Sequence, residues 1–253
     1  MEKFTKLFTK SVKEYQNKFM TIFKIFIYLY LIPSIILITI GLLTIASIVA
    51  SSGISKTQIT SIIMGNIGQE ETVLIVKNIF DSIPVATLAI AIAVLILLFL
   101  IYLIFNLLTT LSFFQVAFSK KNNISFYESF YKGKKYFWKI VGLTLLMIIL
   151  LTPLFMLFII PGIIFMVFWT FAIYIIIDKD SKITDSLTQS YHMVKRRWWR
   201  TFGIILLFII ISTIVSFILQ QIPIIGGTLP TLIIAPITII FFKNFYLDMK
   251  NKR

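Results

Sequence analysis

Long apolar runs without a single charge alternate along this chain with short basic segments. The charge-free runs cover Ile25–Ser55, Ser82–Ser119, Ile140–Ile177 and Thr201–Phe242. A transmembrane helix needs about 20 apolar residues, so each of the first two runs predicts one crossing. Each of the last two is long enough for two crossings and has turn residues in its middle, at "IIPGII" (159–164) and "QQIPIIGGTLP" (220–230). The pattern therefore predicts six transmembrane helices.

Three segments within this pattern raise further expectations. Residues 85–118 contain no central proline or glycine, so we expect one long helix whose end extends beyond the lipid. Residues 220–230 form either a short outer turn or a shallow re-entrant loop, and the turn is favoured. The outer loop 56–84 contains "EETVLIVKNIF" (70–80), which predicts a short amphipathic helix that contacts a ligand or partner.

The basic segments indicate how the helices are oriented. Of the 24 Lys and Arg residues, all except Lys56 and Lys77 fall at the two ends of the chain or between helices 2 and 3 and helices 4 and 5. Because cytoplasmic loops of membrane proteins are rich in Lys and Arg, we expect both termini on the cytoplasmic side of the cytoplasmic membrane. The formal net charge of +14 is then mostly a topology signal. It favours contact with anionic lipids and argues against nucleic acid.

Three basic segments also have the periodicity of amphipathic helices that lie in a membrane interface. They cover residues 1–19, 125–138 and 184–199. The second begins with Ser125 and Glu128, which are spaced as a capping box, and the third begins with Thr184, an expected N-cap. The apolar stripe of the first consists of Phe4, Leu7, Phe8, Val12, Tyr15 and Phe19.

The second and third amphipathic segments align with each other at an offset of 61 residues. Ser129 matches Ser190, and "KKYFWKIVG" (134–142) matches "KRRWWRTFG" (195–203). In the first segment Ser11 and Phe19 fit the same pattern. We therefore expect an all-helical membrane protein with a single domain, 1–253. Its three repeats, each an interfacial helix plus a transmembrane hairpin, would cover about 1–118, 119–178 and 179–253.

The stretch that runs from "IIPGII" through "KRRWWRTFG" into the fifth helix resembles the multi-pass membrane proteins related to YciC. These share their domain with the membrane part of some glycerophosphoryl diester phosphodiesterases. The resemblance covers residues 120–215 well and the N-terminal third in outline, and it implies a six-helix membrane domain with an envelope-related role. The catalytic barrel of those phosphodiesterases uses paired histidines and metal-binding carboxylates, whereas this chain has one histidine and ten carboxylates.

Groups that could carry out chemistry are few. The chain has no cysteine, and a metal-binding or general-base role for His192 would need further ligands or partners. Glu128, Asp178, Asp180 and Asp185 fall at helix ends on the basic side, where we expect them to cap helices and to pair with cations. No carboxylate is expected in the middle of a span, so an ion relay is not supported. We therefore predict a protein that is not an enzyme and has no catalytic, cofactor or metal site.

The sequence favours a membrane protein that organises lipids or partner proteins through a basic, aromatic cytoplasmic face. The expected partners are anionic lipid headgroups, with a protein partner or a second copy of the chain left open. The residues expected at the headgroups or the interface are Lys134, Lys135, Trp138, Lys139, Lys195, Arg196, Arg197, Trp198, Trp199 and Arg200.

The alternative function is that of a transporter, or of its membrane subunit, for a lipid or a hydrophobic solute. Its signals are a polar stretch that begins at Asn106 in the second helix, and prolines inside three predicted helices, Pro33, Pro153 and Pro236. Hydrogen bonding between helices also accounts for the polar stretch. A continuous polar cavity that reaches Asn106 would favour transport.

Overall fold

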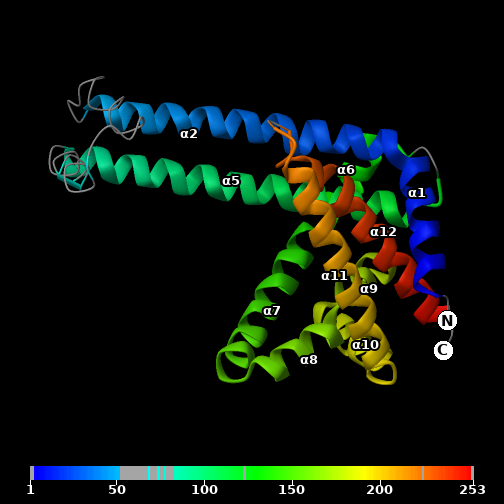
Figure 1. The fold of residues 1–253 in the computed structure, drawn as a ribbon. Coiled ribbons are helices and arrows are strands. Elements are labelled where there is room, and N and C mark those ends of the chain that lie inside the picture. The colour runs from blue at the N-terminus through cyan, green and yellow to red at the C-terminus, as the bar shows by residue number, and fades with distance from the viewer. Residues whose placement is uncertain are drawn as a thin grey trace. The chain divides into compact units, whose positions relative to one another are not determined.

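The computed structural model describes residues 3–51, 83–121, 124–223 and 225–251, together with Gly68, Val73, Leu74 and Lys77. All regular structure in these residues is helical (Figure 1). Most of the helix expected at 70–80 lies outside the described residues. The helical elements are α1 (Phe4–Ile25), the π-helix η1 (Phe26–Leu31), α2 (Ile32–Ser51), α5 (Val85–Phe118), α6 (Phe126–Lys135), α7 (Phe137–Leu157), α8 (Ile159–Trp169), α9 (Ala172–Lys179), α10 (Ile183–Lys195), α11 (Trp198–Gln220) and α12 (Leu229–Asn251).

Six helical stretches of the described chain are long and apolar enough to cross a membrane, which confirms the number predicted. They are Phe4–Ser51, Val85–Phe118, Phe137–Leu157, Ile159–Lys179, Trp198–Gln220 and Leu229–Asn251. The chain is thus a multi-pass membrane protein. The first stretch differs from the prediction, because α1 continues through η1 into α2 and no loop separates residues 1–19 from the first span.

The break between α7 and α8 comes slightly earlier than "IIPGII". Phe158 has extended backbone angles and ends α7, so Pro161 lies in the first turn of α8, where proline removes no helical hydrogen bond. Gly162 follows because the Phe155 ring packs against its backbone. A Cβ at this position would lie 2.6 Å from Cδ1 of Phe155.

The described residues between α11 and α12 form turns, in agreement with the favoured prediction for 220–230. The backbone N–H of Gly226 donates to the carbonyl of Ile222 at 2.9 Å. A Cβ on Gly226 would lie 2.4 Å from that same oxygen, so the turn requires glycine.

The chain divides into two compact units, one of which is Leu31–Phe105. Within this unit α2 and the first part of α5 run side by side (Figure 1). A Cβ on Gly41 would lie 4.0 Å from Cδ1 of Leu98. None of the residues of α2 is buried. The exposed isoleucine and leucine side chains of such a hairpin are suited to contact with lipid tails.

The other unit consists of Met1–Tyr30 and Asn106–Arg253, and its core lies where α5, α9 and α12 meet. Phe114 of α5 packs against Tyr174 of α9 with ring centroids 5.0 Å apart. Phe171, which precedes α9, packs against Phe245 of α12 at 5.4 Å. Such aromatic pairs stabilise a core beyond the area that they bury. A neighbouring apolar cluster joins α5, α7, α9 and α10 through Leu111, Ile140, Leu143, Ala172, Ile176 and Leu187.

Each of the three basic helices packs against a helix that returns from a hairpin. α6 crosses α5 so closely that a Cβ on Gly133 would lie 3.1 Å from the backbone of Leu111. α10 packs against α8 and α9, and α1 runs beside α12 (Figure 1). The order of contacts therefore closes on itself, since the first basic helix contacts the last returning helix.

The face that α1 buries agrees only in part with the predicted apolar stripe. α1 buries Leu7, Ser11, Tyr15 and Lys18, whereas Phe19 of the predicted stripe is exposed. Helix packing selects this face because small and polar side chains meet polar groups of α12 and α5, as described below.

The predicted helix caps are wrong. Ser125 precedes α6 but makes no side-chain cap, and Glu128 bonds to Lys132 instead of reaching back to the helix start. α10 begins at Ile183, so Thr184 lies inside the first turn and Lys182 occupies the N-cap position without a cap bond.

Candidate functional site

The two aligned basic segments have similar backbone arrangements, although α10 ends one aligned position earlier than α6. We call residues 134–142 the first junction and residues 195–203 the second junction. In each, an amphipathic helix ends and an apolar helix begins, with α7 starting at Phe137 and α11 at the aligned Trp198. The turns are held by equivalent bonds, from Tyr136 N–H to the Gly133 carbonyl at 2.9 Å and from Arg197 N–H to the Val194 carbonyl at 2.8 Å.

Each junction exposes one indole at the same aligned position. Trp138 is 80% exposed and Trp199 is 79% exposed. A large aromatic side chain that is held out of the core beside several cations has the character of the residues at a membrane–water interface, where Trp is enriched.

The cations of the first junction are largely engaged by the protein itself. Lys135 donates to the Asp180 carboxylate at 2.9 Å, and Lys139 donates to the carboxylate and the backbone carbonyl of the same residue. Asp180 ends α9 in the left-handed region, with φ 52°, a conformation that Asp tolerates better than most residues. Lys134 is exposed. The expected pairing of Asp180 with nearby cations is confirmed.

These contacts shift the protonation equilibria of the paired groups. Hydrogen bonds from Lys139 and Lys135 hold the pKa of Asp180 below its usual value. The hydrogen bond to Asp180 raises the pKa of Lys135. Both shifts favour the charged forms, so this ion pair persists throughout the physiological pH range.

The second junction is arranged differently. Lys195 and Arg196 are exposed, and Arg197 and Arg200 are half-buried. The Lys195 ammonium lies 5.5 Å from the centre of the Tyr191 ring. The exposed His192 follows on α10 beside that ring. Among the described residues no group of three or more His, Cys, Asp or Glu side chains is placed to hold a metal ion.

Trp198 of the second junction forms one wall of an apolar groove. Its ring stacks on Phe202 with centroids 5.1 Å apart, and its Nε1 donates to the carbonyl of Ile164 at 3.4 Å. The groove has a volume of about 510 Å³ and lies between α8 and the start of α11. Its lining residues are Ile160, Ile163, Ile164, Phe168, Trp198, Trp199 and Phe202.

A buried ionic network joins α1, α12 and the end of α5, and sequence reasoning missed it. Glu14 accepts hydrogen bonds from Lys243 at 2.7 Å to both carboxylate oxygens and from Lys18 at 2.8 Å. Lys18 and Lys243 are only 3% and 6% exposed. Lys18 also donates to the carbonyls of Val116 and Ser119, at 2.9 and 2.8 Å. Asn244 adds bonds to Ser11 and Glu14.

A second polar contact ties α9 to α12. Asp178 accepts hydrogen bonds from the Tyr246 hydroxyl at 2.7 Å and from Lys250 at 2.6 Å. The sequence signals for both contacts were weak. Glu14 and Lys18 have the spacing of a helical ion pair, and Lys243 interrupts an otherwise aromatic stretch, "FFKNFY".

Three aligned serines are fully buried, one in each amphipathic helix. The Ser11 and Ser129 hydroxyls donate to carbonyls of their own helices, at 2.7 and 3.0 Å. Ser190 instead connects two elements, because its hydroxyl donates to the Phe168 carbonyl at 2.6 Å and accepts from the Phe171 N–H at 3.2 Å. Ser190 thereby satisfies backbone groups at the break between α8 and α9.

The polar stretch of α5 is used mainly within the protein. The hydroxyls of Thr110 and Ser112 donate to the carbonyls of Asn106 and Leu108 on their own helix. Such bonds are a common way for Ser and Thr to be accommodated in apolar helices. The side-chain nitrogen of Gln115 is buried without a hydrogen-bond partner among the described residues.

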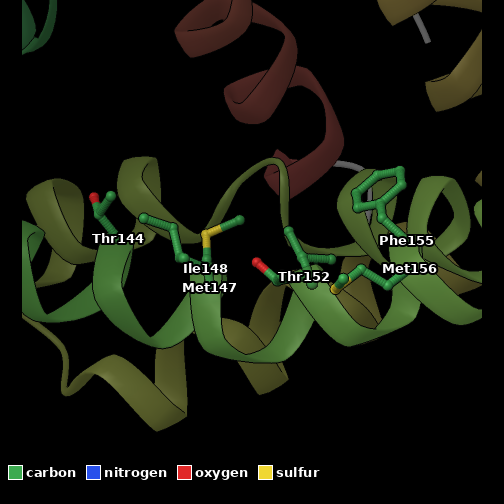
Figure 2. Close-up of a pocket in the computed structure, with 7 residues that line it drawn as sticks. Thr144, Met147, Ile148, Thr152, Phe155 and Met156 are labelled. Carbon is green, nitrogen blue, oxygen red and sulfur yellow. The ribbon is translucent and has the colours of Figure 1, made fainter.

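A further groove runs along α7, with a volume of about 530 Å³. Figure 2 shows that its side chains follow one side of the helix, including two methionines and the hydroxyls of Thr144 and Thr152. No cation lines it. This groove is thus a recess on an apolar helix, without the charges that mark the junctions.

Comparison with known proteins gives one finding. A family model described as a domain of unknown function, DUF7847, matches residues 135–241. The matched segment contains most of the first junction, the whole second junction and the helices α7 to α11. No curated protein and no solved structure matches the chain significantly.

Proposed function

We propose that this protein binds and organises anionic lipids of the cytoplasmic membrane in which it is embedded, and that it does so without catalysing a reaction. The observation that carries the proposal is the pair of junctions. Two segments with the same local turn each expose an indole, Trp138 or Trp199, by about 80% beside several cations. In this role the indoles fix the depth of the helices at the headgroups, and each cation attracts lipid phosphate by about 1 kcal/mol.

The proposal includes an orientation with both termini, α6 and α10 on the cytoplasmic side. The distribution of Lys and Arg supports this orientation. The segments on the proposed outer side contain only two of these residues, Lys56 and Lys77, and both fall in the sequence between α2 and α5. An anionic inner leaflet would then face both junctions.

We also propose that the protein is built from three repeats, each an amphipathic helix followed by a transmembrane hairpin. Three observations support this: the aligned turns of the junctions, the buried serines Ser11, Ser129 and Ser190, and the closed order in which basic helices contact returning helices.

The resemblance to the membrane proteins related to YciC belongs to the same proposal. The residues that carry it, 120–215, overlap the segment 135–241 matched by the family model. It extends the proposed role to the organisation of the cell envelope, with lipids or a protein as partner.

Transport of a lipid or hydrophobic solute is the alternative proposal. It needs a polar path along α5 near Asn106. The bonds of Thr110 and Ser112 to their own helix favour packing over such a path. We therefore place lipid binding first.

Lipid retention measured by native mass spectrometry tests the proposal. The full chain, purified in mild detergent, should retain phosphatidylglycerol in preference to phosphatidylcholine when both are offered at equal concentration. Replacing Lys134, Lys195 and Arg196 by glutamine should lower that preference by about fivefold per headgroup-contacting cation. Replacing Lys10 and Lys13, exposed lysines of α1, should change it less. Equal retention of both lipids by the unmodified chain would refute the proposal.

Cysteine labelling tests the orientation. The chain contains no cysteine, so a single introduced cysteine reports its own side of the membrane. In intact cells Thr228→Cys should react with a membrane-impermeant maleimide, and Ser125→Cys should react only after lysis. The reverse pattern would overturn the orientation.

A further inference from the structure

We propose that the groove between α8 and α11 is a specific site for one anionic phospholipid, whose acyl chain fills the groove and whose phosphate lies at Lys195 and Arg196. This inference rests on the proposed function and assigns its principal binding site to the second junction. The first junction serves mainly as a structural clamp.

The groove itself is suited to a hydrocarbon chain. Its volume of about 510 Å³ falls within the range of ligand sites in proteins, and its lining consists of isoleucine, phenylalanine and tryptophan side chains. The Trp198 indole is anchored by its bond to the Ile164 carbonyl and by its stack on Phe202. The wall is therefore already in place before a ligand binds.

A chain of ring contacts connects the groove to a cation. Phe168 lines the groove and packs against Tyr191 with centroids 4.7 Å apart. The Lys195 ammonium lies over the Tyr191 ring, 5.5 Å from its centroid. Arg196 is the next residue and is exposed. An apolar recess with a positive end is complementary to an acyl chain that carries an anionic headgroup.

The first junction keeps one exposed cation, Lys134, but differs from the second in both parts of this site. Lys135 and Lys139 are bound to Asp180, which supplies the negative charge that a phosphate would otherwise provide. Phe137, which aligns with Trp198, packs against the apolar cluster formed by α5, α7, α9 and α10. The two repeats thus differ where ligand binding requires it, although their backbones turn in the same way.

Fluorescence quenching by brominated lipids tests this assignment. A variant with Trp138, Trp169 and Trp199 replaced by phenylalanine keeps Trp198 as its one tryptophan. In phosphatidylcholine vesicles, phosphatidylglycerol with brominated acyl chains should quench Trp198 at a lower mole fraction than brominated phosphatidylcholine. The expected preference is about fivefold for each cation that the headgroup contacts.

Variants of the single-tryptophan chain distinguish the parts of the site. Lys195→Gln with Arg196→Gln should abolish the preference. Lys10→Gln with Lys13→Gln, which changes two exposed lysines of α1, should leave it unchanged. Ile163→Phe, which fills the groove, should weaken quenching by either lipid. Its control, Ile149→Phe, lies on the exposed surface of α7.

Equal quenching by the two lipids, or a preference that survives the Lys195 and Arg196 substitutions, would overturn the inference. Native mass spectrometry of the unmodified chain covers the case in which the single-tryptophan variant does not fold, because Ile163→Phe in that chain should then reduce retained phosphatidylglycerol. Retention of anionic lipid by the chain without preferential quenching of Trp198 would refute this site alone. Absence of any anionic preference in retention would refute the proposed function as well.

Discussion

Replacing Glu14 by glutamine should destabilise the unit that contains α1 and α12 more than replacing Lys243, its partner. In Glu14→Gln, Lys243 loses the two bonds of 2.7 Å that its ammonium makes to the carboxylate. In Lys243→Met, Glu14 keeps Lys18 at 2.8 Å and Asn244 at 3.2 Å. The first change leaves a nearly buried ammonium without a counter-charge, whereas the second leaves a carboxylate that is still paired.

The magnitudes follow from these contacts. Removing one partner of a buried ion pair costs about 3–5 kcal/mol, which we expect for Glu14→Gln. Loss of hydrogen bonds by a group that keeps other partners costs about 1–2 kcal/mol, which we expect for Lys243→Met. For a chain of this size these values correspond to melting temperatures lower by about 6–20 °C and about 2–8 °C.

Thermal unfolding in detergent, followed by circular dichroism at one heating rate, provides the measurement. The double variant Glu14→Gln/Lys243→Met should melt no lower than Glu14→Gln, because Lys18 retains the carbonyls of Val116 and Ser119. Lys13→Met, a change of an exposed lysine on the same helix, is the control. A Glu14→Gln variant that melts at or above Lys243→Met, or additive losses in the double variant, would refute this account of the network.

Five other substitutions test the contacts of the repeated segments. Gly133→Ala should lower the free energy of unfolding by about 1–3 kcal/mol, because a Cβ there meets the backbone of α5. At Gly203 a Cβ would have no atom within 4 Å, so Gly203→Ala should be neutral or stabilising by up to about 1 kcal/mol. Equal melting temperatures of the two variants would contradict this. Ser190→Ala should lower the melting temperature more than Ser129→Ala, since only the former leaves two backbone groups at the α8–α9 break unpaired, at about 1–3 kcal/mol. Asp180→Asn should raise the retention of anionic lipid by the first junction. The pKa of Asp180 is lowered in the folded protein. The unmodified protein should therefore be more stable than Asp180→Asn above about pH 3.9, and this difference should disappear as the pH falls through the lowered pKa. A difference in stability that does not depend on pH would contradict the ion pair.

The spans could be predicted from the sequence because lipid imposes a simple rule on them. A helix that crosses a membrane must be apolar over about 20 residues, and runs without charge therefore identify it. The position of the α7–α8 break was off by a few residues, because Pro161 fits the first turn of a helix as well as a turn between helices. Local signals place such a break only approximately.

The faces of the amphipathic helices could not be predicted in the same way. In α1, periodicity correctly placed Leu7 and Tyr15 on the buried side but wrongly included Phe19, which is exposed. It gave no sign that Ser11 and Lys18 are buried, since their partners lie on α12 and α5. Those partners lie far away in the sequence, and neither Lys18 nor Lys243 is marked as buried by its own neighbours. Buried polar groups need specific partners, so their placement depends on the tertiary fold.

For the two junctions, the sequence predicted the local backbone but not the difference in their contacts. The alignment of "KKYFWKIVG" with "KRRWWRTFG" indicated equivalent roles, and the backbones of the two segments are indeed alike. The difference between them comes from Asp180 and from the groove beside Trp198, which the aligned letters do not contain.

The contact between α1 and α12 also sets an order for biosynthesis. Glu14 precedes Lys243 by 229 positions, so it is synthesised well before its partner. Until α12 is made, the polar side of α1 has no partner there, and a nascent chain presents it unmatched to chaperones and proteases. The contacts of Glu14 with Lys243 and Asn244 can therefore form only after α12 has been made, and a chain that ends before α12 lacks them.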